Sequence, residues 1–415
     1  MSTRRMGGNA GNLLYGNGVA RTLASSANDL RFGAYTVYRE PDLVAEAARI
    51  NENYDHFVIP MANSFRASYG KQLTQFTELI KMLDIPVTLV GVGAQATADS
   101  MDNEDFRMSR TGRLWTPDQS KADKHNATVR AFCEAILERS SEIGVRGAFT
   151  KAYLESVGIP AESVRVIGCP SVYTWGPGLQ IQNRTRKLNR FSRVSMNIDY
   201  RVANIDRVIA ANMEAYPRLT SPSQDAASAR MILTGKDQYD LEKVNLGTPV
   251  HTGHPMYAKR SVLYYSNPWG WIESFKNIDF TFGARLHGNI ASILGGTPAH
   301  LLAHDSRTTE LADFHGIPYT RYDKDAAPVL AGDLVEKTDY TQFNTLMQDG
   351  FDNFIEFLHA NNLTTIYDTD RGEAPAFDAG IAAGKKIGAE RPASQSRYVR
   401  WIERKAKINS GAPNN

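Results

Sequence analysis

Residues 279–305 read DFTFGARLHGNIASILGGTPAHLLAHD, and this stretch constrains the fold more than any other part of the chain. Phe280 and Phe282 are spaced as on one face of a buried strand, and Gly283 then permits a tight turn. Apolar residues next recur at helical spacing, and a second short apolar run at 299–303 predicts another strand. A strand, a tight turn, a helix and a strand in this order predict one unit of an α/β fold.

Arg285, His287 and Asn289 stand at the predicted start of this helix. A helix start offers free N–H groups and a partial positive charge, so it attracts anions, and an Arg and a His strengthen that attraction. The sequence therefore favours an anionic ligand here. The alternative from the residues alone is a helix start whose polar side chains only cap it and face solvent.

The same arrangement occurs once more, earlier in the chain. Arg146 ends a predicted strand at 142–146 and is followed by a glycine and a predicted helix at 150–157. An arginine repeated at two strand-to-helix turns favours two walls of one anion site over a surface arginine in an ion pair, although the ion pair stays open.

Strands alternate with helices on both sides of a Gly-, Pro- and Arg-rich linker at 176–193, and this predicts two doubly wound α/β domains. A chain of 415 residues is also too long for one core. We expect an N-terminal domain at 1–180, a second domain at 181–330 and a helical extension at 331–415. Two weaker patterns predict a short strand at 231–234 and an irregular loop at 97–126.

Composition excludes several classes of function. A net charge of +2 argues against nucleic acid as a partner, and two cysteines, Cys133 and Cys169, exclude a disulfide framework and fit a reducing compartment. His251 and His254 have no evident third ligand, so we expect no metal site. With neither a secretory signal nor an apolar run long enough to span a bilayer, we expect a cytoplasmic protein.

The end of the chain is basic and contains a short amphipathic stretch. Such a segment can bind the inner face of a membrane peripherally, or it can simply be solvated. The basic residues are Lys385, Lys386, Arg391, Arg397, Arg400, Arg404, Lys405 and Lys407.

Taken together, these motifs resemble the polysaccharide pyruvyl transferase family. The resemblance is carried by FGARLHGN at 282–289 with GTP, HDSR and GIP after it, and by IGVRGAFTKAYLESVGIP at 143–160 followed by VIGCPS. It extends over most of residues 7–318.

The resemblance implies a GT-B-like fold, in which two Rossmann-like domains face each other across a cleft, with the helical C-terminal extension outside it. It implies an enzyme that moves the pyruvate unit of phosphoenolpyruvate onto two hydroxyls of a saccharide to form a ketal. Phosphoenolpyruvate would be a co-substrate, with no further cofactor. The acceptor would be a saccharide or a lipid-linked oligosaccharide.

Residue by residue, the resemblance makes Arg146 a donor-binding arginine and Arg285 and His287 the central pair, and these three are the expected catalytic residues. His287 would either donate a proton or only bind phosphate. Asn12 stands where the family has an acidic residue, which removes any role there as a base. Arg307 stands where the family often has lysine. The expected donor-binding residues are Arg307, Gly288, Asn289, Asn9, Asn12 and Ser64.

Two other functions remain open from the sequence. One is a nucleotide-sugar glycosyltransferase of the same architecture, in which Asp305 would contact the ribose, because a fold does not determine a function. The other is a non-catalytic protein that binds sugar or phosphate, given Asn12 in place of an acid.

Overall fold

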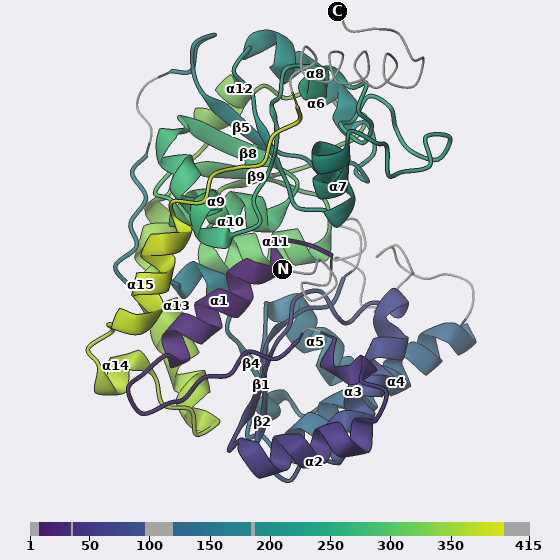
Figure 1. Ribbon diagram of the computed structural model, residues 1–415, viewed down its shortest axis with the longest axis vertical. Helices are drawn as coiled ribbons and strands as arrows, with labels where there is room; N and C mark the ends of the chain where they lie inside the picture. The colour runs from purple at the N-terminus through teal and green to yellow at the C-terminus, as the bar shows by residue number, and fades with distance from the viewer. Residues whose placement is uncertain (1–7, 35, 96–118, 184–186, 394–415) are drawn as a thin grey trace, which may run out of the picture.

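A computed structural model describes residues 8–34, 36–95, 119–183 and 187–393, and it contains two parallel β-sheets, one in each half of the chain (Figure 1). We call the part up to residue 183 the first half and the part from residue 187 to residue 330 the second half. This is the Rossmann-like α/β architecture expected from the sequence.

The sheet of the first half has four parallel strands in the order β1-β2-β3-β4. β2 is buried at all six positions, and the apolar stripe of α3, which includes Leu73 and Phe76, packs in the same core. The elements are β1 (Phe57–Pro60), β2 (Val87–Val92), β3 (Ile143–Val145) and β4 (Val164–Val166), with α2 (Leu43–Asn53), α3 (Gly70–Lys81), α4 (Gln119–Leu137) and α5 (Ala148–Ser156).

The sheet of the second half contains four parallel strands in the order β10-β9-β8-β5, and a bridge between Ser195 and Thr220 continues it to the pair β6-β7. The full order β7-β6-β5-β8-β9-β10 is that of a dinucleotide-binding fold, in which the crevice lies where the strand order reverses, at β5 and β8. The strands are β5 (Val194–Asn197), β6 (Ser221–Ser223), β7 (Val262–Tyr264), β8 (Phe280–Gly283), β9 (Ala299–Ala303) and β10 (Tyr319–Arg321). The helices are α6 (Ile205–Ala215), α7 (Ala226–Thr234), α8 (Pro255–Ala258), α9 (Pro268–Ser274), α10 (Leu286–Leu294), α11 (Ser306–His315) and α12 (Ala331–Val335).

Helices from both ends of the chain join the halves. α1 (Asn12–Leu23) runs between them in Figure 1, beside α13 (Thr341–Ala360), α14 (Ile366–Thr369) and α15 (Pro375–Gly384). Arg21 of α1 donates to Asp378 of α15 over 2.8 Å. One hydrophobic core contains Val90 of the first sheet, Leu301 of the second and Phe354 of α13, so it belongs to both halves.

Three expected elements differ from the structure. Residues 231–234 are the end of helix α7, not a strand. The irregular stretch expected at 97–126 is wrong from residue 119 onward, where α4 begins, and residues 97–118 lie outside the described part of the chain. Strand β6 was not expected, because its three residues, Ser-Pro-Ser, carry no apolar pattern.

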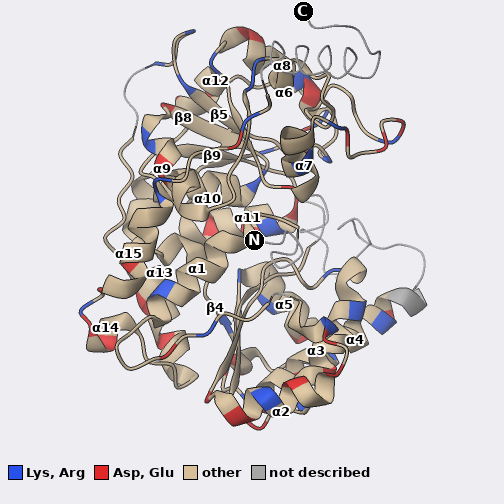
Figure 2. Ribbon diagram, in the orientation of Figure 1, with Lys and Arg blue, Asp and Glu red and all other residues tan. Residues whose placement is uncertain are grey.

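Charges of both signs are interspersed over the two halves (Figure 2). In the part of the chain that the structure describes, no helix is both long and apolar enough to cross a bilayer. Most of the basic C-terminal segment, from residue 394 onward, lies outside the described residues.

Candidate active site

The turn between β8 and α10 brings the RLH motif to the carboxyl end of the second sheet. Gly283 has a φ of +139°, and a Cβ there would lie 2.7 Å from the backbone nitrogen of Asn197 on β5. Only glycine fits this turn. Arg285 then forms the N-cap of α10, and His287 lies in its first turn.

Asn289 and Gly288, two of the expected donor-binding residues, stabilise the turn itself. The buried side-chain amide of Asn289 donates to the carbonyls of Gly283 (2.9 Å) and Arg285 (3.1 Å). At Gly288 a Cβ would clash with the side chain of Asn197, which also donates to Asn289 over 3.2 Å. Both residues therefore shape the backbone on which His287 stands.

Arg146 follows β3 and is completely buried. Its Nε donates to the carbonyl of Gly91 over 2.8 Å, and Gly93 makes room for its side chain, since a Cβ there would lie 2.8 Å from Cδ. Neither Nη atom has a hydrogen-bond partner among the described residues. Burial and the charge of Arg307 lower the pKa of Arg146, but a guanidinium stays charged at neutral pH.

Arg307 lies in the first turn of α11, after β9. Its Nη2 contacts Asp305 Oδ2 over 3.1 Å, and its buried Nε has no partner among the described residues. Asp305 is the N-cap of α11, and its Oδ1 accepts from the backbone N–H of Thr308 over 2.9 Å. Burial works to raise the pKa of Asp305, but Arg307 and these hydrogen bonds hold it near 2.

His287 is close enough to Arg146, Arg285 and Arg307 for their positive charges to act on it. It is 5% exposed, its ring centroid is 5.6 Å from that of Tyr15, and its Nε2 is 4.0 Å from the sulfur of Cys169. Burial and the charges of Arg146, Arg307 and Arg285 lower its pKa well below the ordinary value. The imidazole is therefore neutral at pH 7 in the ligand-free protein.

Arg285 differs from the other two arginines because carboxylates already bind it. Its Nη2 lies 2.5 Å from Asp225, and its Nε lies 3.8 Å from Asp199. Burial works to lower its pKa, but these two carboxylates raise it overall. The sequence predicted the position of Arg285 in the site but not its two acidic partners.

The N-terminal segment at residues 9–12 also lies at this site. The backbone of Asn9 forms an isolated antiparallel β-bridge with that of Asp225. The Oδ1 of Asn9 accepts from the N–H of Gly11 over 2.9 Å. A Cβ on Gly11 would lie 3.0 Å from that of His287 and 2.6 Å from Oε1 of Gln224. Asn9 and Gly11 thus lie beside the cluster, and Asn12 begins α1 directly after them.

Ser64 is buried after β1, next to the bridge between Phe65 and Ala94. The backbone N–H of Phe65 donates to the carbonyl of Gly93, the residue that makes room for Arg146, but among the described residues no hydrogen bond joins Ser64 itself to the arginines or to His287. Cys169 and Gln224 also lie at the cluster, but neither of them was assigned a role from the sequence. Cys169 ends a recognisable strand motif, so its place could have been found, whereas Gln224 follows the unexpected strand β6.

The described residues contain no group of three or more His, Cys, Asp or Glu side chains placed to hold a metal ion. His251 and His254 instead contact the carbonyls of Leu246 and Gly247. The chemistry of the cluster rests on guanidinium and imidazole groups at the carboxyl ends of three parallel strands, which suits a multiply charged anion.

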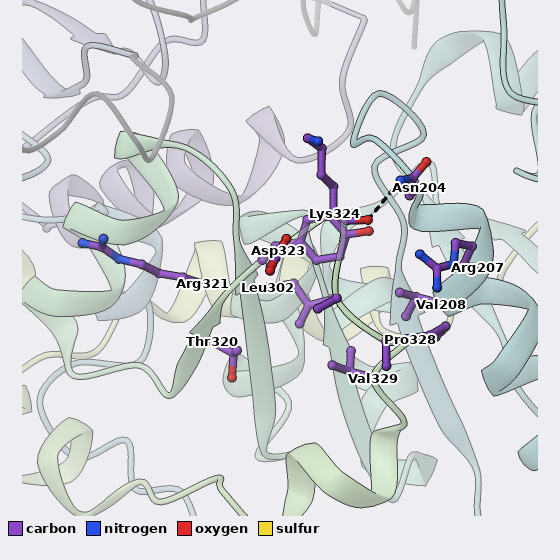
Figure 3. A pocket seen from close by; sticks show the side chains of 13 residues that line it. Asn204, Arg207, Val208, Leu302, Thr320, Arg321, Asp323, Lys324, Pro328 and Val329 are labelled. Atoms are coloured by element: carbon purple, nitrogen blue, oxygen red, sulfur yellow. Dashed lines mark hydrogen bonds between the residues drawn. The ribbon is translucent and has the colours of Figure 1, made fainter.

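A separate shallow pocket opens between the start of α6 and the segment after β10 (Figure 3). Its volume is about 90 Å³, below the roughly 300–1,000 Å³ usual for small-molecule sites. Neither His287 nor any arginine of its cluster lines it, and Asn204 and Lys324 at its mouth bond to each other over 3.0 Å. This pocket is not part of the candidate site.

Several solved structures are distantly similar to the chain. One is described as a UDP-N-acetylglucosamine 2-epimerase from Listeria monocytogenes, at 11% identity, covering 83% of this chain and 84% of that one with a TM-score of 0.37. Another is HepE of Anabaena in complex with UDP and glucose, at 12% identity, covering 82% and 80% with a TM-score of 0.36. No curated protein matches the chain.

One protein family matches most of the chain. The model of the polysaccharide pyruvyl transferase family matches residues 9–306, from the asparagine beside the cluster to the start of α11. This range includes Arg146 and the RLH motif, and it covers well over half of the chain. The chain belongs to the polysaccharide pyruvyl transferase family.

Proposed function

We propose that this protein transfers the pyruvate unit of phosphoenolpyruvate to two hydroxyls of a saccharide and leaves a pyruvate ketal in a polysaccharide or glycan. Phosphoenolpyruvate carries a phosphate and a carboxylate close together. A site for it needs several cations and many N–H donors in a place from which water is excluded.

The observation that supports this proposal is the set of buried guanidinium nitrogens without a protein partner. Both Nη atoms of Arg146 and the Nε atom of Arg307 have no hydrogen-bond partner within the described residues, and the charges of Arg146, Arg307 and Arg285 all lower the pKa of His287. Leaving a buried donor unpaired costs free energy, so a ligand that accepts from these donors regains it. In this proposal Arg146 and Arg307 bind the donor, and Arg285 fixes the turn that carries His287.

The reaction needs a proton at the methylene carbon of phosphoenolpyruvate and a positive centre at C2. One acceptor hydroxyl attacks C2 and loses its proton, which replaces the one delivered to the methylene carbon. The C2–O bond to phosphate then breaks, the second hydroxyl closes the ketal, and its proton leaves with the phosphate. His287 is neutral in the ligand-free protein, but the charge of a bound donor offsets the three arginines and raises its pKa again. His287 can then supply the proton, and in its neutral form it can only hydrogen-bond the phosphate.

Mass spectrometry of a glycan panel incubated with phosphoenolpyruvate tests the proposal directly. A product heavier by pyruvate minus water supports ketal formation. A gain of one hexose from a nucleotide sugar would show a glycosyltransferase instead, and binding without any product would show a non-catalytic protein. Glycan profiling of a deletion strain would identify the acceptor.

We further propose that the basic C-terminal segment binds anionic lipid at the inner face of the membrane, and that the acceptor is a saccharide or a lipid-linked oligosaccharide. Clustered Lys and Arg near a surface of anionic lipid contribute about 1 kcal/mol each. Removing residues 394–415, which carry five of the eight basic residues of the segment, should therefore strongly reduce co-sedimentation with anionic vesicles and leave donor affinity unchanged. Equal sedimentation of the two proteins would refute the membrane contact without touching the proposed chemistry.

A further inference from the structure

Glu310 lies on α11, one helical turn beyond Arg307, and its side chain crosses from the second half of the molecule to the first. Its Oε2 accepts from the backbone N–H of Thr150 over 3.0 Å, and its Oε1 accepts from the Thr150 hydroxyl over 2.8 Å. Both residues are buried. Neither residue was assigned a role from the sequence.

Thr150 is in the first turn of α5, where backbone N–H groups have no partner within the helix. A side-chain oxygen that accepts there satisfies an N–H group that would otherwise lack a partner. The Thr150 hydroxyl also accepts from the N–H of Ala94, which follows β2. Glu310 thus connects α11 to two turns of the first sheet.

The glycine of the VRG motif is what permits this contact. A Cβ on Gly147 would lie 2.7 Å from both Cβ and Oε2 of Glu310. The φ of Gly147 is −170°, which any residue adopts, so the requirement for glycine here is steric. The motif therefore brings Arg146 to the site and also leaves room for Glu310.

Arg146 directly precedes Gly147, and Arg307 shares α11 with Glu310. The two guanidinium groups repel each other, and the charge of Arg307 lowers the pKa of Arg146. An attraction between their supporting elements must offset this repulsion. A second contact acts in the same place, because Gln95 donates to Asp305 at the N-cap of α11 over 3.0 Å.

We propose that Glu310 is a positioning residue that latches α11 to the N-terminus of α5 and thereby fixes the spacing between Arg146 and Arg307. What the two arginines bind rests on the function proposed above. The latch itself is a property of the ligand-free protein, so the two proposals can fail separately.

The test compares Glu310→Ala and Thr150→Val with Thr150→Ser, which keeps the hydroxyl, and with Glu46→Gln, which changes a carboxylate on the remote helix α2. We measure phosphoenolpyruvate affinity by calorimetry and the radius of gyration of the ligand-free protein by small-angle X-ray scattering. Misplacing binding groups by an ångström is costly, so the first two variants should weaken affinity by about tenfold or more. They should also expand the protein, whereas the two controls should match the wild type.

Wild-type affinity and wild-type dimensions in both Glu310→Ala and Thr150→Val would overturn the latch. An equal loss in Thr150→Ser would overturn the role of the hydroxyl contact. If Glu310→Ala does not fold, Thr150→Val, which keeps the backbone donor, gives the answer. If the wild type does not bind phosphoenolpyruvate, the proposed function fails, and scattering alone still decides whether the latch exists.

Discussion

Arg146 and Arg285 stand at equivalent turns in the two halves, but they differ in what already binds them. Both Nη atoms of Arg146 are unpartnered among the described residues, whereas Arg285 forms ion pairs with Asp225 and Asp199. An arginine with a free fork is suited to bind a ligand, and one held by two carboxylates is suited to hold a structure in place.

Replacing each arginine by alanine should therefore give different losses. A charged hydrogen bond contributes about 1.5–3 kcal/mol, so Arg146→Ala should weaken phosphoenolpyruvate binding by roughly 10- to 100-fold. Arg285→Ala leaves Asp225 without its cation, while Asp199 keeps its ion pair with Arg201, and the change should lower the free energy of unfolding by about 3 kcal/mol. Calorimetry and urea denaturation of both variants measure the two effects. The assignment is wrong if Arg146→Ala loses stability but keeps affinity.

His287 should take up a proton when the donor binds. Burial and three positive charges lower its pKa in the ligand-free protein, so it is neutral at pH 7, and a multiply charged anion reverses the local field. Calorimetry of phosphoenolpyruvate binding at pH 7, in buffers of different ionisation enthalpy, gives the number of protons absorbed.

The control for this prediction is His287→Asn, which keeps a hydrogen-bonding side chain but cannot be protonated. The wild type should absorb up to about one proton more than this variant. Equal proton uptake by the two proteins would mean that His287 stays neutral and only binds phosphate. A loss of turnover of about a hundredfold or more in the variant would support proton donation.

At the scale of single elements, the sequence predicted the strands and helices whose apolar residues recur at one regular spacing. The largely apolar run at 85–92 predicts a strand, and β2 forms there. Phe351, Phe354 and Leu358 lie on one helical face, which predicts a helix at 343–361, and α13 forms there. β6 has no apolar period, and it forms because its neighbours β5 and β7 supply the pairing. Sequence alone does not contain that tertiary contribution.

The contact between α11 and α5 makes a prediction about pH. Burial raises the pKa of Glu310 to about 7, while Arg146 lowers it and Asp305 raises it. A carboxyl whose pKa is raised by folding favours the folded state when protonated, so the wild type should lose stability as the pH rises from about 4.5 to 7. The side chain at position 310 in Glu310→Gln remains neutral at every pH, so this position should cause no loss of stability as the pH rises.

The measurement is the free energy of unfolding of both proteins in urea at pH 5 and at pH 8. The advantage of Glu310→Gln over the wild type should be larger at pH 8, by on the order of 3 kcal/mol. Comparing differences between the two pH values removes any constant effect of the amide itself. An advantage that is the same at both pH values would show that Glu310 does not titrate in this range.

At the scale of the whole molecule, the sequence predicted which turns carry the functional residues but not what surrounds them. Arg146 and Arg285 were found because each follows a strand and precedes a helix. Asp225 and Glu310 reach them only through contacts between segments 60 to 160 residues apart. No local pattern encodes such pairs.

The two expected halves share one hydrophobic core, so they are joined more closely than two separate domains. One core holds residues of both sheets and of α13, and Phe357 of α13 packs against β3, where a Cβ on Gly144 would lie 2.8 Å from its ring. Elements that share a core unfold together, so we expect one cooperative transition in denaturant for the whole protein.

Removing the ring of Phe357 tests this unity. The side chain is fully buried, and a Phe→Ala change in a core costs about 3–5 kcal/mol, so Phe357→Ala should shift the transition to lower urea and keep it single. Phe191→Ala is the matched control, because Phe191 is 66% exposed and its loss should leave the midpoint unchanged. Fluorescence and circular dichroism should report the same midpoint in all three proteins. If the two probes separated in Phe357→Ala, α13 would connect two halves that fold independently, and α11 could then move away from α5 without unfolding either sheet.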